Sequence, residues 1–274
     1  MSRLSWWPRK KAVPVPDATP RSRCLSYQCA AIQGIGARDY QEDAWTLVNA
    51  ADVTQIKKTG LLAVVADGMG GMENGSLASM TGIRILTEDF RNMNRSLPLE
   101  KQLTCSLFRA ADAVYSVNQG KSGSTMVATI LFGEQLYYAG VGDSYLYLLR
   151  DDVLIRINRE QNVLHQRYLD SIRNGNVDHF AVQGVSQPQA ITGFLGMPDL
   201  RDVDQLHRAM PLKGGDVLLL CSDGVGGVLQ PEEIRDCLNI PNANEAAAAL
   251  KQAVLEKNRK HQDNFTAIVI CCKK

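Results

Sequence analysis

Five aspartates stand where apolar segments of the sequence give way to turns: Asp43, Asp67, Asp143, Asp223 and Asp263. Two of them share a context, because residues 61–66 lead into Asp67-Gly68 and residues 217–221 lead, after one serine, into Asp223-Gly224. A continuous apolar run that ends at glycine is typical of a buried strand, so these aspartates are expected where strands emerge into loops. Carboxylates at strand ends suit hard divalent cations. Each aspartate alone is more simply a turn residue. The set predicts a metal centre, because gathered carboxylates repel one another unless cations neutralise them.

The segments between the aspartates carry strand and helix patterns. Strands are predicted at residues 24–33, 45–48, 61–66, 124–132, 135–141, 144–150, 153–157, 217–221 and 267–272, with those from 124 to 157 forming one antiparallel meander. Two amphipathic stripes predict helices, the first through Leu77, Met80, Ile83, Leu86 and Phe90, the second through Leu99, Leu103, Leu107, Ala110, Val114 and Val117. Further helices are predicted from Pro231 and over residues 244–260. This order of elements indicates an α+β layered fold.

The bulk composition excludes several classes of protein. The chain has 274 residues, of which 45% are hydrophobic and 22% are charged, and its formal net charge is +1. A near-neutral chain is a poor candidate for a nucleic-acid binder or a metal-dependent nuclease. No apolar run reaches the ~18 residues that a membrane span needs. Seven cysteines without CxxC spacing favour buried, reduced thiols in a cytoplasmic protein over disulfides or a zinc site.

Two segments differ in character from the rest. Residues 1–23 are basic and rich in proline, which predicts a tail, so that the folded domain spans residues 24–274. Trp6 and Trp7 in this tail also suit contact with a partner or a membrane surface. Residues 158–189 are polar and weakly patterned, which predicts a helix plus a loop that acts as a mobile flap over a site. His179 of this segment is placed to approach a substrate, whereas the other histidines are expected at the surface or in packing contacts.

Six short motifs follow one another in the chain. They are Arg38-x-x-Gln41-Glu42-Asp43, Ala66-Asp67-Gly68-Met69-Gly70-Gly71, Gly123-Ser124-Thr125, Val141-Gly142-Asp143-Ser144, Ser222-Asp223-Gly224 and Asp263-Asn264-x-Thr266. Over residues 27–270 this series resembles the metal-dependent Ser/Thr protein phosphatases, the PPM or type-2C family, in their bacterial form. The resemblance implies a four-layer α/β-β/α sandwich of two antiparallel sheets flanked by helix pairs. It also implies two Mg²⁺ or Mn²⁺ ions in a cleft at one edge.

The resemblance assigns a role to each residue of the set. Asp43 would bridge both ions, Asp67 and the carbonyl of Gly68 would serve one of them, and Asp223 and Asp263 would hold the other. Asp143 would share a third ion with Asp223. Arg38 corresponds to the arginine that clamps the phosphate, and a guanidinium fork suits two phosphate oxygens. A surface salt bridge is the alternative explanation for Arg38.

The activity implied is hydrolysis of phosphoserine and phosphothreonine on proteins by a water that bridges the ions, without a phosphoenzyme, because the chain lacks a Cys-x5-Arg motif. The implied substrates are phosphoproteins made by a cognate Ser/Thr kinase, and we expect a monomer. Two features depart from the family. Met69 replaces a histidine that serves some members as general acid, so a metal-bound water would protonate the leaving group. Residues 158–162 replace an Asp-His-Ser segment. Alternatives are a catalytically silent pseudophosphatase that binds phosphoproteins and a regulatory phosphatase dedicated to one anti-sigma-factor-type partner.

Overall fold

The longest apolar runs of the chain form the central strands of two antiparallel β-sheets. We describe a computed structural model of the protein, which covers residues 25–69, 73–175, 184 and 186–274. The first sheet contains, in order, β1 (Ser26–Gly34), β13 (Phe265–Lys273), β12 (Val217–Cys221), β8 (Tyr145–Arg150) and β9 (Val153–Arg156). The second contains β10 (Asp204–Gln205), β7 (Gln135–Val141), β6 (Met126–Phe132), β3 (Leu61–Ala66) and β2 (Ala44–Val48), and β11 (Met210–Pro211) also pairs with β7. A short ladder joins β4 (Gly68–Met69) to β5 (Gly123–Ser124).

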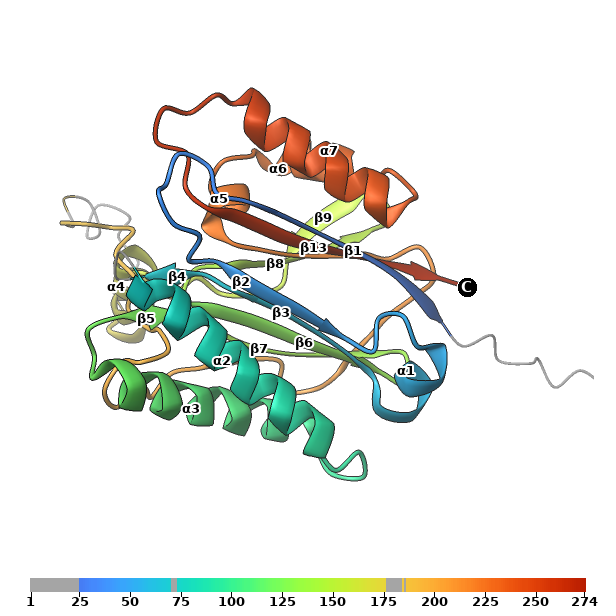
Figure 1. The fold of residues 1–274 in the computed structure, drawn as a ribbon, viewed down its shortest axis with the longest axis horizontal. Helices are drawn as coiled ribbons and strands as arrows, with labels where there is room; N and C mark the ends of the chain where they lie inside the picture. Colours follow the sequence, from blue (N-terminus) through green and yellow to red (C-terminus); the bar gives the residue numbers. More distant parts are fainter. Residues whose placement is uncertain (1–24, 70–72, 176–183, 185) are drawn as a thin grey trace, which may run out of the picture.

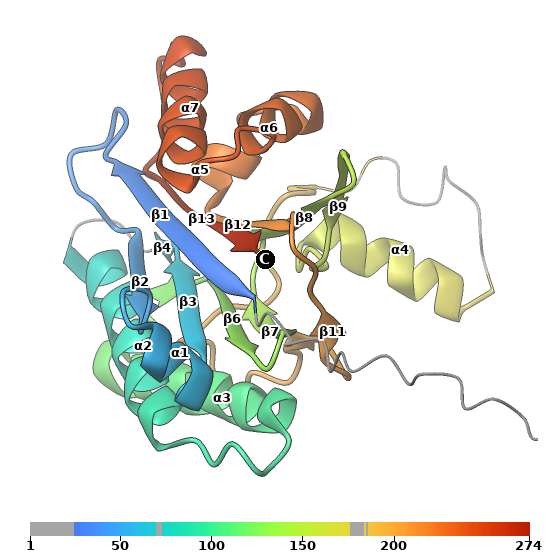
Figure 2. The ribbon, with the colours of Figure 1, turned by 90° about the vertical axis from the view of Figure 1, so that its right-hand side faces the viewer.

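The two sheets pack face to face, and helices cover both outer surfaces (Figures 1 and 2). Helices α2 (Glu73–Asn92) and α3 (Leu99–Asn118) lie on the second sheet, whereas α6 (Pro231–Leu238) and α7 (Ala243–Glu256) lie on the first. Shorter helices are α1 (Val53–Thr59), α4 (Val163–Arg173) and α5 (Asp223–Gly226). This arrangement confirms the predicted four-layer α+β sandwich.

Strands β3 and β12 are buried on both faces, which explains why their sequences are continuous apolar runs rather than alternating ones. Leu218 and Leu220 of β12 face the core between the sheets, and Leu219 faces the core beneath α6 and α7. On β3, Leu61 likewise faces the inter-sheet core and Leu62 faces α2 and α3. The inner strands are therefore held between two apolar layers, and their ends have fixed positions.

The predicted four-strand meander is wrong in one respect. Strands β6 and β7 form a hairpin in the second sheet, but β8 and β9 form a hairpin in the first, so the chain crosses between the sheets at residues 142–144. Gly142 makes the crossing in the left-handed region, with φ of 97°, and a side chain there would overlap Thr125. A hairpin and a crossing use the same turn residues, which is why the pattern did not separate them.

The stripe predicted on α2 is only partly correct. Leu86 and Phe90 are buried as expected, but Leu77 and Met80 are 44% and 61% exposed. The N-terminal half of α2 instead packs through small residues, among them Ala78, and these permit a close approach to β4 and β5. On the second stripe, the last residue, Val117, is likewise exposed.

Other predictions fall at the margins of the described structure. The proposed tail, residues 1–23, and His179 lie outside the described residues, so the boundary of the domain stays a prediction. Within the predicted flap, α4 is the expected helix. Cys221, Cys271 and Cys272 are buried as expected, but Cys105 is exposed, which contradicts the prediction of a buried thiol there. No helix among the described residues is long and apolar enough to cross a membrane.

Candidate metal centre

The register of the strands places all five aspartates at the same end of the sandwich. Ala44 pairs with Ala66, so Asp43, just before β2, and Asp67, just after β3, lie at one end of the second sheet. The chain crosses to the first sheet at Asp143, which follows β7 at this same end. Strand pairing alone therefore brings these three residues together, although they are far apart in the sequence.

The first sheet contributes the other two aspartates in the same way. Cys221 pairs with both Ala267 and Tyr145, so the end of β12 lies beside the start of β13 and the start of β8. Asp223 follows β12 and Asp263 precedes β13. Asp223 opens the single turn of α5 and does not stand in a loop, which corrects the prediction for its local structure.

Side-chain hydrogen bonds join the two sheets across this end. Ser222 Oγ donates to Asp43 Oδ2 at 2.8 Å and accepts the backbone N–H of Thr266 at 3.0 Å. The carboxyls of Asp67 and Asp223 lie close enough to share a hydrogen bond when one of them is protonated. Three aspartates from two sheets are thereby brought together, and Asp263 adds to the negative potential at Asp43, Asp67 and Asp223.

Burial and mutual repulsion make these carboxyls hard to ionise. Burial, together with the charges of Asp223 and Asp263, raises the pKa of Asp43 to about 6. Burial and the charge of Asp223 raise the pKa of Asp143 to about 6. The pKa of Asp67 lies well above its usual value, and that of Asp223 is also raised, in both cases chiefly by burial.

Two carboxylate oxygens of the centre have no partner. Asp43 Oδ1 and Asp223 Oδ1 are buried and accept no hydrogen bond. An unpaired buried carboxylate oxygen is costly, and a bound divalent cation would remove that cost. Among the described residues, no group of three or more His, Cys, Asp or Glu side chains is already arranged around an ion position. Mg²⁺ dehydrates reluctantly and keeps several waters when a protein binds it, so a few carboxylate oxygens suffice to hold it, and Mn²⁺ takes the same oxygen ligands. The donor set therefore fits the predicted ions.

Arg38 makes the contact that the alternative explanation predicted. Its Nη2 lies 2.6 Å from Asp263 Oδ2, and the two side chains are 57% and 41% exposed. The hydrogen bond and the charge of Asp263 raise the pKa of Arg38. The other oxygen, Asp263 Oδ1, accepts the backbone N–H of Asn264 at 2.8 Å. Arg38 is thus at the rim of the aspartate centre, and its predicted role toward phosphate stays a prediction.

Asp67 and Gly68 are held by their backbone. The Asp67 N–H donates to Thr125 Oγ1 at 3.1 Å, and its carbonyl accepts the Thr125 N–H at 2.8 Å. The Gly68 N–H donates to the carbonyl of Glu42 at 3.2 Å, and a side chain on Gly68 would overlap that oxygen and the carbonyl of Gly75. Gly70 and Gly71 lie outside the described residues.

Asn264 fixes the loop that carries Arg38, although it was not among the predicted site residues. Its Oδ1 accepts the N–H of Glu42 at 2.7 Å, and its Nδ2 donates to the carbonyls of Ile35 at 2.8 Å and Tyr40 at 3.0 Å. Ser222 and Thr125 are two further residues that support the aspartates and were not predicted. All three residues lie inside the six sequence motifs, and this position was the one feature of the sequence that could have identified them.

The segment that departs from the family, residues 158–162, anchors the surroundings of Asp143. Asn158 accepts the Leu146 N–H at 2.8 Å and donates to the Ser144 carbonyl at 2.7 Å. Arg156 donates to the Asp143 carbonyl at 3.3 Å and also pairs with Glu160. The start of the predicted flap is thus buried and hydrogen-bonded. For the rest of residues 158–189, mobility stays a prediction.

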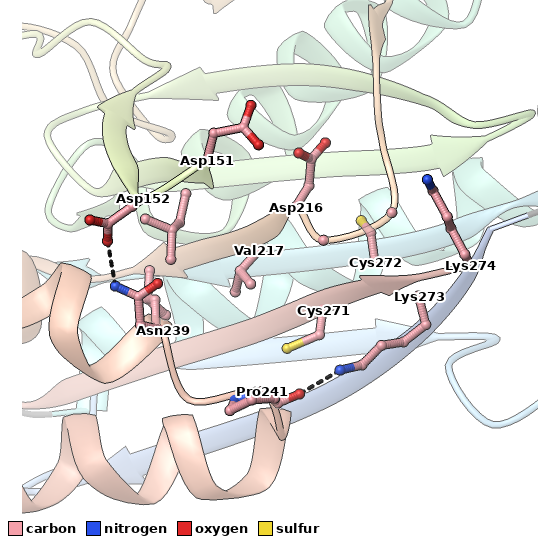
Figure 3. A pocket seen from close by; sticks show the side chains of 14 residues that line it. Asp151, Asp152, Asp216, Val217, Asn239, Pro241, Cys271, Cys272, Lys273 and Lys274 are labelled. Atoms are coloured by element: carbon pink, nitrogen blue, oxygen red, sulfur yellow. Dashed lines mark hydrogen bonds between the residues drawn. The ribbon is translucent and has the colours of Figure 1, made fainter.

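A second acidic region lies at the opposite end of β12, in a cleft of about 400 Å³ (Figure 3). Its buried acid, Asp216, receives two hydrogen bonds from Arg150, at 2.8 and 2.6 Å. Asp152, which also lines the cleft, accepts a hydrogen bond from its neighbour Asn239 at 2.7 Å. This cleft has its own cations and donors, so it does not share the chemistry of the five aspartates.

Comparison with known proteins agrees with this geometry. The family model for protein phosphatase 2C matches residues 37–259, which include Arg38 and four of the five aspartates. The chain belongs to the protein phosphatase 2C family. The serine/threonine phosphatase Stp of Listeria innocua is 28% identical over 219 residues, which are 76% of this chain and 83% of that protein.

Solved structures of this family show the same fold. The crystal structure of the Mycobacterium tuberculosis serine/threonine phosphatase PstP has a TM-score of 0.72 at 24% identity, and the match covers 90% of this chain and 99% of that one. A structure of the PstP catalytic domain in complex with two manganese ions has a TM-score of 0.71 at 24% identity, covering 92% and 100%. The predicted resemblance to bacterial protein phosphatases is confirmed at the level of family and fold.

Proposed function

We propose that this member of the protein phosphatase 2C family is an active, metal-dependent enzyme that hydrolyses phosphoserine and phosphothreonine on proteins. The observation that carries the proposal is the uncompensated charge at one end of the sandwich. Among the described residues, the only salt bridge of the five aspartates is the half-exposed one between Arg38 and Asp263. A fold that buries carboxylates without cations of its own is built to receive cations.

The aspartates divide into two overlapping sets, each of which would serve one ion. Asp43 would contact two Mn²⁺ or Mg²⁺ ions, with Asp67 and the Gly68 carbonyl on one and Asp223 and Asp263 on the other. Such a pair of ions stabilises the charge of a transferring phosphoryl group and lowers the pKa of the water that attacks phosphorus. Asp143, beside Asp223, would serve a third ion. PstP, which has the same fold, was solved with two manganese ions.

The protein's own groups orient this chemistry. Ser222 holds Asp43 Oδ2 and leaves Oδ1 for a cation. Asn264 fixes the loop from residue 35 to 42, which places Arg38 at the rim of the centre. The Arg38 guanidinium would bind two phosphate oxygens of the substrate, and for this it would exchange its present contact with Asp263. Met69 cannot donate a proton, so the leaving serine or threonine oxygen would take its proton from water.

A pseudophosphatase that only binds phosphoproteins is the competing function. It would not require four buried or partly buried aspartates with raised pKa values, because their mutual repulsion destabilises a protein that binds no metal. The presence of the whole set favours the enzyme. Its substrates would be phosphoproteins produced by a cognate Ser/Thr kinase, and we propose that it acts as a monomer in a bacterial cytoplasm.

The test is hydrolysis of p-nitrophenyl phosphate and of a phosphothreonine peptide with Mn²⁺, with Mg²⁺ and with EDTA. We expect turnover of both substrates with at least one metal and none with EDTA. A folded protein that binds the phosphopeptide but turns over neither substrate with either metal would support the pseudophosphatase instead. Arg38→Ala should lose phosphopeptide binding in both cases, so it does not distinguish them, whereas turnover does.

A further inference from the structure

Two hollows follow one another along a single strand, starting at the aspartate centre. The first, of about 420 Å³, is lined by Asp43, Ala44 and Trp45, and the second, of about 490 Å³, by the next three residues, 46–48. Helix α2 forms the opposite wall of both, through residues that recur at helical spacing from Ser76 to Arg91. We call the two hollows together the β2–α2 groove.

The β2–α2 groove runs along the backbone edge of β2 rather than over one face of the strand. Side chains alternate between the faces of a strand, so a groove over one face would be lined by every second residue. Here five successive residues, 44–48, line it. Among the described residues β2 is the last strand of its sheet, with β3 on one side and no strand on the other. An end strand leaves backbone N–H and C=O groups that can pair with another extended chain.

The apolar part of the groove lies next to Asp43. Trp45 is 39% exposed and Met80 is 61% exposed, and both line the first hollow together with Ile83. The exposure of Met80, which contradicted the predicted stripe on α2, has a use here. Large apolar side chains at a rim beside a catalytic site are typical anchors for a neighbouring side chain of a peptide.

The charged part of the groove lies further from Asp43. Arg84 lines the first hollow and Arg91 the second, and among the described lining residues Asp43 is the only acid. Arg84 contacts Glu88 on the exposed surface at 3.0 Å, and such an exposed i,i+4 pair holds an arginine weakly. The groove therefore favours an acidic or neutral chain. The first residues of this protein, with Arg9, Lys10 and Lys11, have the opposite charge and fit it poorly.

We propose that the β2–α2 groove binds the polypeptide next to the phosphorylated residue of a phosphoprotein substrate, as an extended strand added to β2. This rests on the proposed phosphatase function. With the phosphate at Asp43, an apolar substrate residue near it would contact Trp45 and Met80, and acidic residues further along would contact Arg84 and Arg91. The five residues of β2 span ~17 Å, so recognition extends over about five residues on one side of the phosphoresidue.

The test compares three phosphothreonine peptides on the full-length protein with Mn²⁺. One has alanines on both sides, one carries a five-residue apolar-then-acidic extension on the N-terminal side, and one carries it on the C-terminal side. We expect one extension, not both, to raise kcat/KM by about tenfold through a few added hydrogen bonds and apolar contacts. N-methylation of alternate residues in that extension should abolish the gain, because it removes the donors that pair with β2.

The protein side is tested with Arg84→Glu/Arg91→Glu, and with Lys251→Glu on α7 as the control for a reversed charge on the far helix layer. The readout is kcat/KM on the extended peptide divided by kcat/KM on p-nitrophenyl phosphate. The double variant should lower this ratio by about tenfold and Lys251→Glu should leave it unchanged. The inference is overturned if neither extension helps, if N-methylation has no effect, or if both variants behave alike.

The same peptides separate a failed inference from a failed function. If p-nitrophenyl phosphate is hydrolysed but the extensions have no effect, the phosphatase stands and the groove proposal falls. If nothing is hydrolysed, the proposed phosphatase function is wrong. Binding of fluorescently labelled versions of the three peptides, measured by fluorescence anisotropy in EDTA, then tests the groove proposal. Tighter binding of one extended peptide, weakened by N-methylation, would still support it, and equal binding of all peptides would overturn it.

Discussion

Each end of β12 carries an aspartate, and the fold treats the two aspartates in opposite ways. At the start of the strand, Asp216 is 2% exposed and receives two hydrogen bonds from Arg150. At the other end, Asp223 lies among further aspartates and has a buried oxygen without a partner. Only the five residues of β12 and Ser222 separate a neutralised acid from an uncompensated one.

The contrast shows what distinguishes a structural acid from a ligand. An acid that the fold itself neutralises is tolerated as one half of an ion pair, and removal of either half alone destabilises the protein. When the fold leaves an acid without a cation, burial and the neighbouring carboxylates raise the pKa of that acid. Its charge then destabilises the protein until an external ion binds. Acidic residues alone do not point to a metal site, and our proposal of one depends on the lack of a cationic partner for these aspartates.

The largest effect is expected from Asp223→Asn. Removing a ligand should lower metal-dependent turnover of p-nitrophenyl phosphate by more than ~100-fold, beyond the range that loss of an outer hydrogen-bond partner costs. Without metal, the free energy of unfolding of this variant should not fall, because the substitution removes a repelling charge. Urea unfolding in EDTA measures the second point, and a large loss of stability there would mean that Asp223 is a structural acid.

The matching substitution at the other end, Asp216→Ala, should have the reverse profile. It leaves the partly buried Arg150 without its carboxylate partner, so it should destabilise the protein by about 2 kcal/mol. Turnover of the remaining folded protein should be unaffected. The double substitution Arg150→Met/Asp216→Leu is the control, and it should regain most of the loss because it removes both charges at once. If the double variant stays as unstable as Asp216→Ala, the loss of stability does not come from the unpaired Arg150.

Ser222→Ala tests the hydrogen bond that orients Asp43. Loss of this donor should weaken Mn²⁺ binding by about 10- to 100-fold, with turnover recovered at high Mn²⁺. A titration of activity against Mn²⁺ concentration measures it. Ser106→Ala on α3, which removes a buried hydroxyl remote from the aspartates, serves as the control for loss of a buried hydroxyl. Equal Mn²⁺ requirements for both variants would contradict the role given to Ser222.

Arg38→Lys should have the smallest effect of the four. Arg38 is the exposed counterpart of Arg150, with one hydrogen bond to its carboxylate where Arg150 makes two. Lysine keeps the charge beside Asp263 but loses the planar fork, so kcat/KM should fall by about tenfold. Steady-state kinetics with both substrates measure this. An unchanged kcat/KM would mean that Arg38 forms only a surface salt bridge and does not bind the phosphate.

The sequence was sufficient wherever local pattern and tertiary environment agree. Residues 61–66 and 217–221 form strands over the predicted ranges because continuous apolar runs suit strands buried on both faces. The five aspartates were identifiable because each lies next to the end of a predicted strand. Their common location did not follow from the pattern alone, since it depends on which strands pair, and the resemblance to a known family supplied it.

The remaining features depend on packing that a pattern does not contain. Met80 and Leu77 have helical spacing with the buried residues of α2, but that half of the helix packs through small residues and leaves both exposed. The crossing at Gly142 has the turn chemistry of a hairpin, and only the arrangement of the sheets decides between them. Ser222 is an ordinary serine in the sequence, and its role appears only where β12 and the loop before β2 meet.

The most direct test of the account is an equilibrium titration with Mn²⁺ at neutral pH, with free Mn²⁺ measured by electron paramagnetic resonance. The wild-type protein, Asp223→Asn and Asp216→Asn are compared under the same conditions. We predict that the wild type binds at least two ions, that Asp223→Asn loses at least one of them, and that folded Asp216→Asn binds as the wild type does. No binding by the wild type, or equal losses in both variants, would contradict the claim that the uncompensated aspartates form the metal centre.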